Sequence, residues 1–478
     1  MSPASIGDAA RLLEDLHLSS ISIAQIVTRV ARELGSPAPR PLSGWARATL
    51  AEIADAFADE VRPHHAAPAA SPPAASWVRA FATVDDPASP PPGPRPGRGA
   101  WRWYGAASGL GALPVDLLDG PAGGTAIVVS DSDLDAIVDG ARAGGPFLVI
   151  DPGRIAGGFA RTLHLETGEP VTVVSFEDPV TPPTLAAIRA EAAGLTAGFR
   201  AVQVGPGGTL TTPVLAAASL PEPDLALGPD DVVVVTGGGK GIAAECALAL
   251  ARRTGCRLIT VGRHAPAGDP GLAANLERFV AYGVRAVHIA ADVTDAAALR
   301  AGLAPAIDAL GQVTAVLHAA AVNEPRAIRE LTAADLRRTI APKLAGLHNT
   351  LACIDRTRLR AVVSFSSIIA RTGLPGEAHY ALANDLLRRA TVELQRELPA
   401  CRCAVLEWSA WAEVGMAERI GRLDALILRG LSPISIDSSA AWRERRRMQG
   451  ARLVPALLDF LSRDNMCPPG ALGRIVEV

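Results

Sequence analysis

The chain has 478 residues, of which 49% are hydrophobic, so it can bury more than one core, and two or three structural units are expected. Its 46 basic and 49 acidic side chains give a net charge of −3, which argues against electrostatic binding to nucleic acid or to an anionic membrane. The scattered cysteines suggest neither a disulfide framework nor a metal site. Without a membrane-length apolar stretch or a secretory signal, the sequence predicts a soluble protein of the reducing cytoplasm.

The N-terminal part is predicted to be a helical leader over residues 1–60, because apolar residues recur at helical spacing from Ala10 to Leu34. An Ala/Pro-rich linker is expected over 61–74. Proline lacks the amide donor that a helix or a central strand needs, so the Pro-rich segment 85–99 is expected to be a linker or surface loop. Between them, the alternating run Trp77–Phe81 indicates a short strand.

Residues 100–225 alternate strand-like apolar runs with helical segments, which predicts an α/β unit. Pro-rich loops are expected at 178–183 inside this unit and at 213–223 where it ends. The expected strands are 126–130, 147–150, 171–175 and 200–204, and the expected helices include 183–193.

Residues 226–478 show the same alternation more regularly. Strands separated by helices predict a parallel, doubly wound sheet with a ligand crevice at the carboxyl edge of its strands. The fold class is therefore α/β, with two Rossmann-like doubly wound units and a short helical leader. The expected strands are 231–235, 257–261, 284–289, 313–318, 359–364, 402–406 and 474–478, and the expected helices are 242–253, 272–282, 296–310, 334–353 and 380–398.

A glycine-rich turn joins the first strand of the second unit to its first helix. The apolar strand Val232–Val235 runs directly into the segment from Thr236 to Ala243. Glycines there let the backbone approach a pyrophosphate held at the positive end of the helix. Such a loop alone could be only a turn, but here strand, loop and helix follow one another as a dinucleotide site requires. The residues expected to bind the cofactor are Thr236, Gly237, Gly239, Lys240, Gly241 and Ile242.

The tips of the following strands complete the expected cofactor site. The second strand ends in Gly262 and Arg263, without the acidic residue that would bind the ribose of NAD, and arginine suits the 2′-phosphate of NADP. NADPH is therefore the predicted cofactor; the alternative is an exposed arginine without this role. Further contacts are expected from Asp292, which can accept from the adenine amino group, and from Val293, Ala319 and Ala320.

Three polar side chains are placed to act on a carbonyl group. Ser367 ends a predicted strand and Tyr380 begins the next helix, so Ser367 could polarise a carbonyl oxygen to which Tyr380 donates a proton. A phenol has a pKa of about 10 and needs a nearby cation to act near neutral pH, and Lys343 on the preceding helix can supply that charge. Because the hydride would come from a nicotinamide, no metal is expected.

The segment from Val363 to Asn384, with the glycine-rich turn and Lys343, resembles the ketoreductase domain of type I polyketide synthases in the short-chain dehydrogenase/reductase superfamily. Generic members carry a lysine at the position of Asn384, whereas polyketide ketoreductases carry asparagine there and the lysine on the upstream helix. The resemblance implies a structural, degenerate Rossmann-like subdomain over 75–225 and a catalytic NADPH-binding subdomain over 226–478. It also implies a catalytic site formed by Lys343, Ser367, Tyr380 and Asn384.

Other stretches resemble the iterative branch of these enzymes, such as enediyne and polyunsaturated fatty acid synthases. They are residues 235–250, 376–380 and 407–416. The resemblance implies that Trp411, Met416 and Glu377 contact the substrate and that 417–431 form a helical lid. Two core aromatics are the competing interpretation of Trp408 and Trp411.

Product configuration stays open because both stereochemical markers of the family are replaced. The Leu-Asp-Asp triplet of one class is Asn323, Glu324 and Pro325 here, and the Trp of the other class is Thr372. The function implied is NADPH-dependent reduction of a β-ketoacyl thioester to the β-hydroxyacyl thioester in polyketide biosynthesis. The alternatives are a short-chain reductase or epimerase for a free metabolite, a non-catalytic scaffold, and a module that binds NADPH as a sensor.

The leader contains the run Asp15–Ile21, which resembles the phosphopantetheine site of an acyl carrier protein. Ser19 stands where that site has an acidic residue, and too few residues precede Ser20, so a helix N-cap is the favoured interpretation. The substrate is therefore expected on a separate acyl carrier protein, whose acidic surface could meet the cluster Arg443–Arg447. We expect no nucleic-acid or membrane partner, and we expect the chain to belong to, or derive from, a multidomain synthase.

Overall fold

The computed structural model describes residues 49, 51–52, 80–90, 101–105, 123–177, 180–195, 198–218, 227–411 and 475–477. Contacts divide the chain into two compact units, Met1–Val78 with Ala410–Ser439 and Arg79–Ser409 with Ala440–Val478. The expected linker, Met416, the lid at 417–431 and the cluster Arg443–Arg447 lie outside the described residues, as does nearly all of the expected leader.

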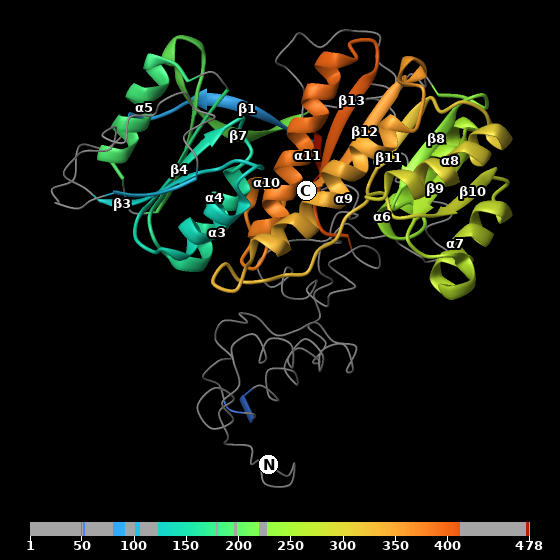
Figure 1. The fold of residues 1–478 in the computed structure, drawn as a ribbon, viewed down its shortest axis with the longest axis horizontal. Helices are drawn as coiled ribbons and strands as arrows, with labels where there is room; N and C mark the ends of the chain where they lie inside the picture. The colour runs from blue at the N-terminus through green and yellow to red at the C-terminus, as the bar shows by residue number, and fades with distance from the viewer. Residues whose placement is uncertain are drawn as a thin grey trace, which may run out of the picture. The chain divides into compact units, whose positions relative to one another are not determined.

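A 14-stranded sheet runs through the second unit (Figure 1). Its strands follow the order β10-β9-β8-β11-β12-β13-β14 and continue as β1-β7-β6-β5-β4-β3-β2. We call these two series the C-terminal half and the N-terminal half of the sheet. They meet where β14 (Ile475–Glu477) pairs parallel with β13 (Arg402–Trp408) and antiparallel with β1 (Ala80–Pro87).

The N-terminal half is built from a parallel series that an antiparallel pair closes. Strands β2 to β6 are parallel to their neighbours, and β7 is antiparallel to both β6 and β1. Buried side chains such as Ile127 and Val149 face α3 and α4, while Val128 and Leu148 face α5, so helices cover both faces. The remaining elements are β2 (Trp101–Tyr104), β3 (Gly124–Val128), α3 (Leu134–Arg142), β4 (Phe147–Pro152), α4 (Gly157–Thr167), β5 (Val171–Phe176), α5 (Pro182–Ala193), β6 (Phe199–Val204) and β7 (Leu210–Ala218).

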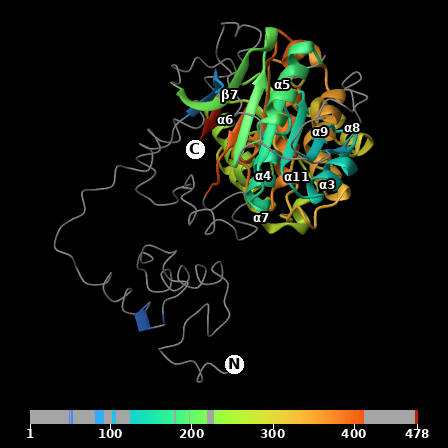
Figure 2. The ribbon, with the colours of Figure 1, turned by 90° about the vertical axis from the view of Figure 1, so that its left-hand side faces the viewer.

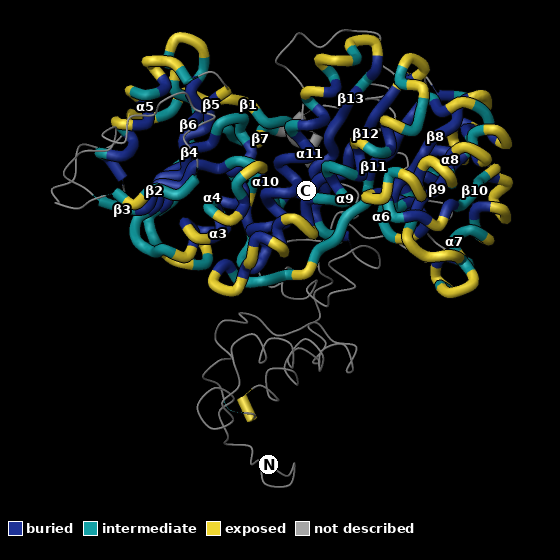
Figure 3. The backbone as a smooth tube through the Cα atoms, in the orientation of Figure 1, coloured by how far each residue is buried: buried dark blue, intermediate teal, exposed yellow. Residues whose placement is uncertain are grey.

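The C-terminal half has the strand order of a Rossmann-type sheet. The order reverses between β8 and β11, and a crevice is expected outside the carboxyl ends of strands at such a point. Buried strands run beneath exposed connecting loops (Figure 3). Its other elements are β8 (Val232–Thr236), α6 (Gly241–Thr254), β9 (Arg257–Gly262), α7 (Pro270–Ala281), β10 (Ala286–Ala290), α8 (Ala296–Leu310), β11 (Ala315–His318), α9 (Ala333–Ala352), β12 (Ala361–Ser367), α10 (Ile369–Thr372) and α11 (Ala378–Glu397).

Helices α9 and α11 are packed between the two halves. Helix α9 starts at a capping box in which the Thr332 side chain accepts from the Asp335 amide and the Asp335 side chain accepts from the Thr332 amide. Leu336 on α9 and Leu382 on α11 are fully buried in one apolar core with Phe159 of α4, and Figure 2 shows α4 beside α11. The N-terminal half therefore covers the helices that carry Lys343 and Tyr380.

Two predicted loops are wrong in part. Strand β7 occupies much of the loop expected at 213–223, and β1 includes Asp85–Pro87 of the expected Pro-rich linker. Strands β1 and β7 pair over eight residues each, whereas β7 pairs with β6 only at Leu210 and Thr211. The ladder with β6 thus stops before Pro213, where a missing amide donor is tolerated. Among the described helices, none is long and apolar enough to cross a membrane.

Candidate active site

The predicted glycine-rich turn connects β8 to α6. Gly237 and Gly241 have φ angles of +68° and +66°, which side chains rarely adopt, and a Cβ on Gly237 would lie 2.9 Å from the carbonyl oxygen of Ala319. Lys240 occupies the N-cap position of α6 without a side-chain cap hydrogen bond. The first-turn amides of α6 are thus left for an anion, and the close backbone approach fits a dinucleotide phosphate.

Thr236 and His318 tie this turn to the neighbouring strand. The Thr236 hydroxyl oxygen accepts from the amides of Ala319 and Ala320 at 3.1 and 3.2 Å and lies 2.8 Å from Nδ1 of His318. Nε2 of His318 donates to the carbonyl oxygen of Lys343 at 2.9 Å, and burial lowers the pKa of His318 to about 3, so the ring stays neutral. Sequence reasoning missed His318; its signal is a polar residue ending an apolar strand.

The tip of β9 carries a basic group of side chains. Arg263 and Lys240 are exposed, Lys240 forms an ion pair with Asp269, and Nδ1 of His264 lies 3.7 Å from the same carboxylate. The Lys240 side chain lowers the pKa of Asp269. The end of β9 and the start of α6 thus bring basic side chains close to one carboxylate, that of Asp269.

The remaining predicted cofactor residues lie at other strand tips. One carboxylate oxygen of Asp292 accepts from the amide and the hydroxyl of Thr294 at 2.8 and 2.7 Å. Val293 is buried and limits the space beside Gly346, where a Cβ would come within 2.7 Å of the valine side chain. Gly262 ends β9, and Ile242 lies in the first turn of α6.

Lys343, Tyr380 and Asn384 form one buried cluster. Nζ of Lys343 donates to the carbonyl oxygen of Phe365 at 3.0 Å and lies 5.4 Å from the centre of the Tyr380 ring. Nδ2 of Asn384 donates to the Tyr380 carbonyl oxygen at 2.7 Å, one turn earlier on α11. Within the described part of the chain, Oδ1 of Asn384 is buried without a hydrogen-bond partner, so it can still accept from a ligand or water.

Ser367 is the last residue of β12, the strand whose Phe365 carbonyl oxygen accepts from Lys343. It lies two residues after Phe365 on β12, and its Oγ accepts from the amide of Ile369 at 3.3 Å. The side chain is largely buried. Tyr380 follows in the first turn of α11, so the strand end and the helix start carry the predicted pair.

Burial dominates the ionisation of the cluster. Burial lowers the pKa of Lys343 to about 7. It raises the pKa of Tyr380 above its usual range, and the carboxylate of Glu377 raises the Tyr380 pKa further. We expected the lysine to make the phenol more acidic. At Tyr380 burial is the largest influence and raises the pKa, because loss of solvent disfavours the phenolate.

The substrate residues are only partly placed. Glu377 is buried directly before α11, and Trp411 is buried. Trp408 packs edge-on against Phe365 with ring centres 5.4 Å apart, so its role as a core aromatic is the supported one. At the replaced stereochemical markers, Glu324 pairs with Arg338 at 2.7 Å, and the Thr372 hydroxyl donates to the carbonyl oxygen of Ile368 at 3.3 Å.

A buried ionic network that sequence reasoning missed adjoins this cluster. Arg371 of α10 binds Glu407 of β13 through two guanidinium nitrogens at 2.6 to 3.0 Å, and it lies 3.8 Å from Asp385 of α11. Arg388 pairs with Asp385 at 3.1 Å and donates to the carbonyl oxygen of Arg154 in the N-terminal half. The available signal was Glu407, an acidic residue near the end of an apolar strand.

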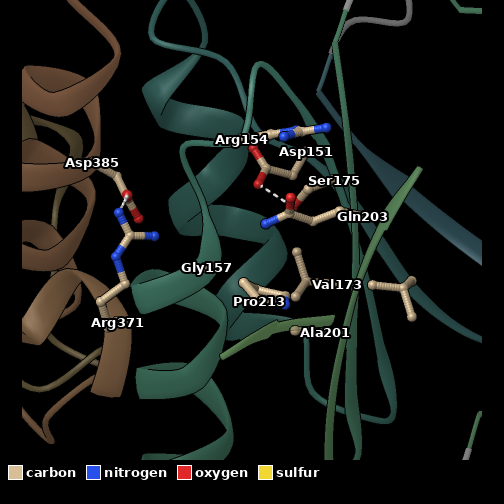
Figure 4. Close-up of a pocket in the computed structure, with 11 residues that line it drawn as sticks. Asp151, Arg154, Gly157, Val173, Ser175, Ala201, Gln203, Pro213, Arg371 and Asp385 are labelled. Carbon is tan, nitrogen blue, oxygen red and sulfur yellow. Dashed lines mark hydrogen bonds and ion pairs between the residues drawn. The ribbon is translucent and has the colours of Figure 1, made fainter. Parts of the chain in front are cut away.

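A small cavity of about 40 Å³ lies between the halves, beside this ionic network (Figure 4). Asp151 accepts from the Ser175 hydroxyl and from the Ile155 amide, both at 2.7 Å, and burial raises the pKa of its carboxyl. None of the predicted catalytic or cofactor residues lines this cavity. Its polar lining comes from Asp151, Ser175 and Gln203 near the ends of β4, β5 and β6, from Arg154, and from Arg371 and Asp385 on the opposite side.

Comparison with known proteins identifies the sheet half that carries this cluster. Residues 232–413 match the sequence model of the family described as KR domain. This part of the chain is similar to the ketoreductase domains of type I polyketide synthases. A ketoreductase domain is an oxidoreductase that uses a nicotinamide cofactor, and the glycine turn described above fits one.

Curated relatives are much longer proteins. The chain is 34% identical over 199 residues to polyketide synthase GfsA of Streptomyces halstedii, which covers 41% of this chain and 3% of that protein. It is 36% identical over 187 residues to erythronolide synthase EryA3 of Saccharopolyspora erythraea, covering 39% and 6%. The chain thus spans a small part of each relative.

Solved ketoreductases share the fold of this chain. The ketoreductase from the first module of phoslactomycin biosynthesis in Streptomyces sp. HK803 is 24% identical, with a TM-score of 0.64 over 84% of this chain and 93% of that one. A C2-type ketoreductase from a modular polyketide synthase is 18% identical, with a TM-score of 0.62 over 84% and 94%. An A1-type and a C2-type ketoreductase match this chain with nearly equal TM-scores of 0.65 and 0.62, so the fold does not distinguish these types. The resemblance to the iterative branch stays a prediction.

Proposed function

We propose that this chain reduces a β-ketoacyl thioester to the β-hydroxyacyl thioester with NADPH. The observation that carries the proposal is the buried cluster in which Lys343 of α9 and Tyr380 and Asn384 of α11 gather beside β12, the strand that ends in Ser367. A scaffold gains nothing from a buried ammonium beside a phenol, because burying that charge destabilises the fold.

The residues of the cluster divide the chemistry among themselves. The nicotinamide, when bound, supplies the hydride to the β-carbon. Ser367 holds and polarises the carbonyl oxygen, and Tyr380 donates the phenolic proton to that oxygen as negative charge develops there. Lys343 stabilises the resulting phenolate, and the free Oδ1 of Asn384 can accept from a water that returns the proton.

NADPH is proposed as the cofactor on charge and geometry. Gly237, Gly239, Gly241 and Ile242 would hold the pyrophosphate against the start of α6. Arg263 would bind the 2′-phosphate, and Lys240 would join it once its ion pair with Asp269 opens. Asp292, Val293, Ala319 and Ala320 would line the rest of the cofactor.

The thioester is proposed to arrive on an acyl carrier protein, because the relatives are polyketide synthases. Turnover of the full chain with NADPH or NADH tests this on β-ketoacyl thioesters of a pantetheine mimic, on the same acyl groups bound to a carrier protein, and on free ketones. We expect NADPH oxidation with thioesters and the highest kcat/KM with the carrier-bound form. Turnover of free ketones alone would support a metabolite reductase. NADPH binding without any turnover would support a sensor.

A further inference from the structure

One carboxylate of the N-terminal half binds two loops of the ketoreductase domain. Glu166 lies on α4, and its Oε1 accepts from the amide of Gly376 at 2.8 Å while its Oε2 accepts from the amide of Ile328 at 2.7 Å. The two donors are 210 and 162 residues away along the chain. Both are backbone groups, so the contact does not depend on the side chains of either loop.

The two loops lead to the catalytic helices. Gly376 immediately precedes Glu377 and lies four positions before Tyr380, at the start of α11. Ile328 lies in the connection from β11 to α9. This connection contains Ala320 and leads into α9, the helix that carries Lys343. Glu166 therefore fixes the segments that enter both helices of the cluster.

The two loops are also hydrogen-bonded to each other, so Glu166 and the two loops are joined pairwise. The amide of Arg326 donates to the carbonyl oxygen of Gly376 at 2.8 Å, two residues before Ile328. Gly376 has a φ of +83°, a conformation that side chains rarely adopt, so the loop is held in one specific shape. The Thr162 hydroxyl of α4 accepts from the amide of Leu374 at 3.1 Å and supports the same loop.

A glutamate is suited to this position for a chemical reason. Each carboxylate oxygen accepts one amide, and hydrogen bonds to an ionised acceptor are stronger than neutral ones. Glutamine would keep one accepting oxygen and turn its amide nitrogen, a donor, toward the second N–H group. Aspartate would keep the charge but shorten the reach from α4.

We propose that Glu166 is a positioning residue of the reduction, through which the N-terminal half sets the relative placement of the Tyr380 phenol and the substrate carbonyl. The proposal rests on the proposed function. Its consequence is that the N-terminal half takes part in catalysis and in stereochemical control. We call the two hydrogen bonds from the Gly376 and Ile328 amides to Glu166 the clamp. Its loss should loosen both loops and let the substrate carbonyl present either face to the cofactor. The glycine turn proposed to bind the cofactor should stay intact.

The experiment compares the full chain with Glu166→Gln and with Asp135→Asn. Asp135 of α3 pairs with Arg337 of α9 at 2.6 Å, so it also joins the two halves, but it is exposed and touches neither loop. The measurements are hydrogen exchange of the Gly376 and Ile328 amides, NADPH affinity by fluorescence, kcat and KM for a β-ketoacyl thioester, and the ratio of alcohol enantiomers.

We expect Glu166→Gln to speed exchange of both amides, to lower kcat by roughly tenfold to hundredfold as misplacement of reacting groups does, and to erode the enantiomer ratio. NADPH affinity should stay within about twofold. Asp135→Asn should leave every readout near wild type. If Glu166→Gln does not fold, Glu166→Asp provides the same test.

Three results would overturn the inference. One is unchanged exchange at both amides, which would show that the clamp is not formed. Another is faster exchange with unchanged kcat and enantiomer ratio, which would make Glu166 a structural contact only. The third is a wild-type chain that turns over no β-ketoacyl thioester, which removes the proposed function itself and is distinguished by the wild-type assay alone.

Discussion

In the C-terminal half of the sheet, β8 passes through two left-handed glycines into α6, whose N-cap Lys240 makes no side-chain cap hydrogen bond. In the N-terminal half, β3 leads to α3, and the Asp133 side chain caps that helix by accepting from the Ala136 amide at 3.2 Å. Similar strand–helix connections therefore differ in whether the helix start satisfies its own amides. An anion site needs amides that the chain has not already used.

The two halves also differ in what surrounds a buried ionisable side chain, Asp151 in one and Lys343 in the other. Near the ends of β4 and β5 in the N-terminal half, the carboxylate of Asp151 accepts from the Ser175 hydroxyl and from the Ile155 amide. Lys343 of the C-terminal half is buried as a cation whose pKa burial lowers to about 7. Burial disfavours the charged form of both groups, so the halves differ in what surrounds each group: Asp151 meets two donors of its own half, and Lys343 lies beside the phenol of Tyr380.

The largest expected effect concerns the network that joins the halves. Arg371→Met would remove the guanidinium fork from the buried carboxylate of Glu407 and one of the two arginines beside Asp385, and both acidic side chains are at most 1% exposed. Removing one partner of a buried ion pair costs about 3–5 kcal/mol, so the free energy of unfolding in urea should fall by that amount. Arg337→Met, which removes an exposed contact between the same halves, should cost less than about 1 kcal/mol. Equal losses would show that burial of the network is unimportant.

Cofactor choice gives the next largest effect. Arg263→Ala should weaken NADPH binding by about 1.5–3 kcal/mol, the range of a hydrogen bond to a charged group, and leave NADH binding nearly unchanged. Fluorescence titration of both cofactors measures the difference. Arg252→Ala is the control, because Arg252 stacks on Tyr282 at the far end of α6. A similar loss for NADPH and NADH would assign Arg263 a structural role.

The ionisation of Lys343 predicts two pH dependences. As pH rises through about 7 the ammonium loses its proton, Tyr380 becomes a weaker acid, and kcat/KM should decline. The folded-state pKa lies below that of an exposed lysine, so between about pH 7 and 10 the unfolded chain binds more protons and the free energy of unfolding should rise with pH. Lys343→Met should lose both dependences. A wild-type kcat/KM that is flat from pH 6 to 9 would contradict this assignment.

The sequence predicted the local features well and the long-range ones poorly. The apolar run Val232–Val235, the place of Ser367 at a strand end and the place of Tyr380 at a helix start all follow from local patterns, so the elements that carry these residues could be predicted without coordinates. Partnerships between distant segments leave no periodic signal. Strand β7 carries Pro213 yet pairs with β1, and the contacts of Glu166 and Arg388 join segments that the sequence treats as separate units.

The cofactor turn shows the same limit at the level of single atoms. Sequence reasoning placed Thr236 among the cofactor contacts. Its hydroxyl is used inside the protein by His318 and by the amides after β11. The spacing of residues locates a turn, but only packing shows which polar groups within it are already satisfied.

The central claim is that the cluster around Tyr380 reduces a β-keto thioester. The most direct measurement uses NADPH carrying deuterium at the transferable nicotinamide position, a β-ketoacyl thioester, and mass spectrometry of the product. We predict a β-hydroxyacyl thioester with deuterium on the β-carbon. Tyr380→Phe should form it at least about a hundredfold more slowly with NADPH affinity retained, and Tyr282→Phe, an exposed control, should match wild type. Product without deuterium, or wild-type rates in folded Tyr380→Phe, would contradict the account.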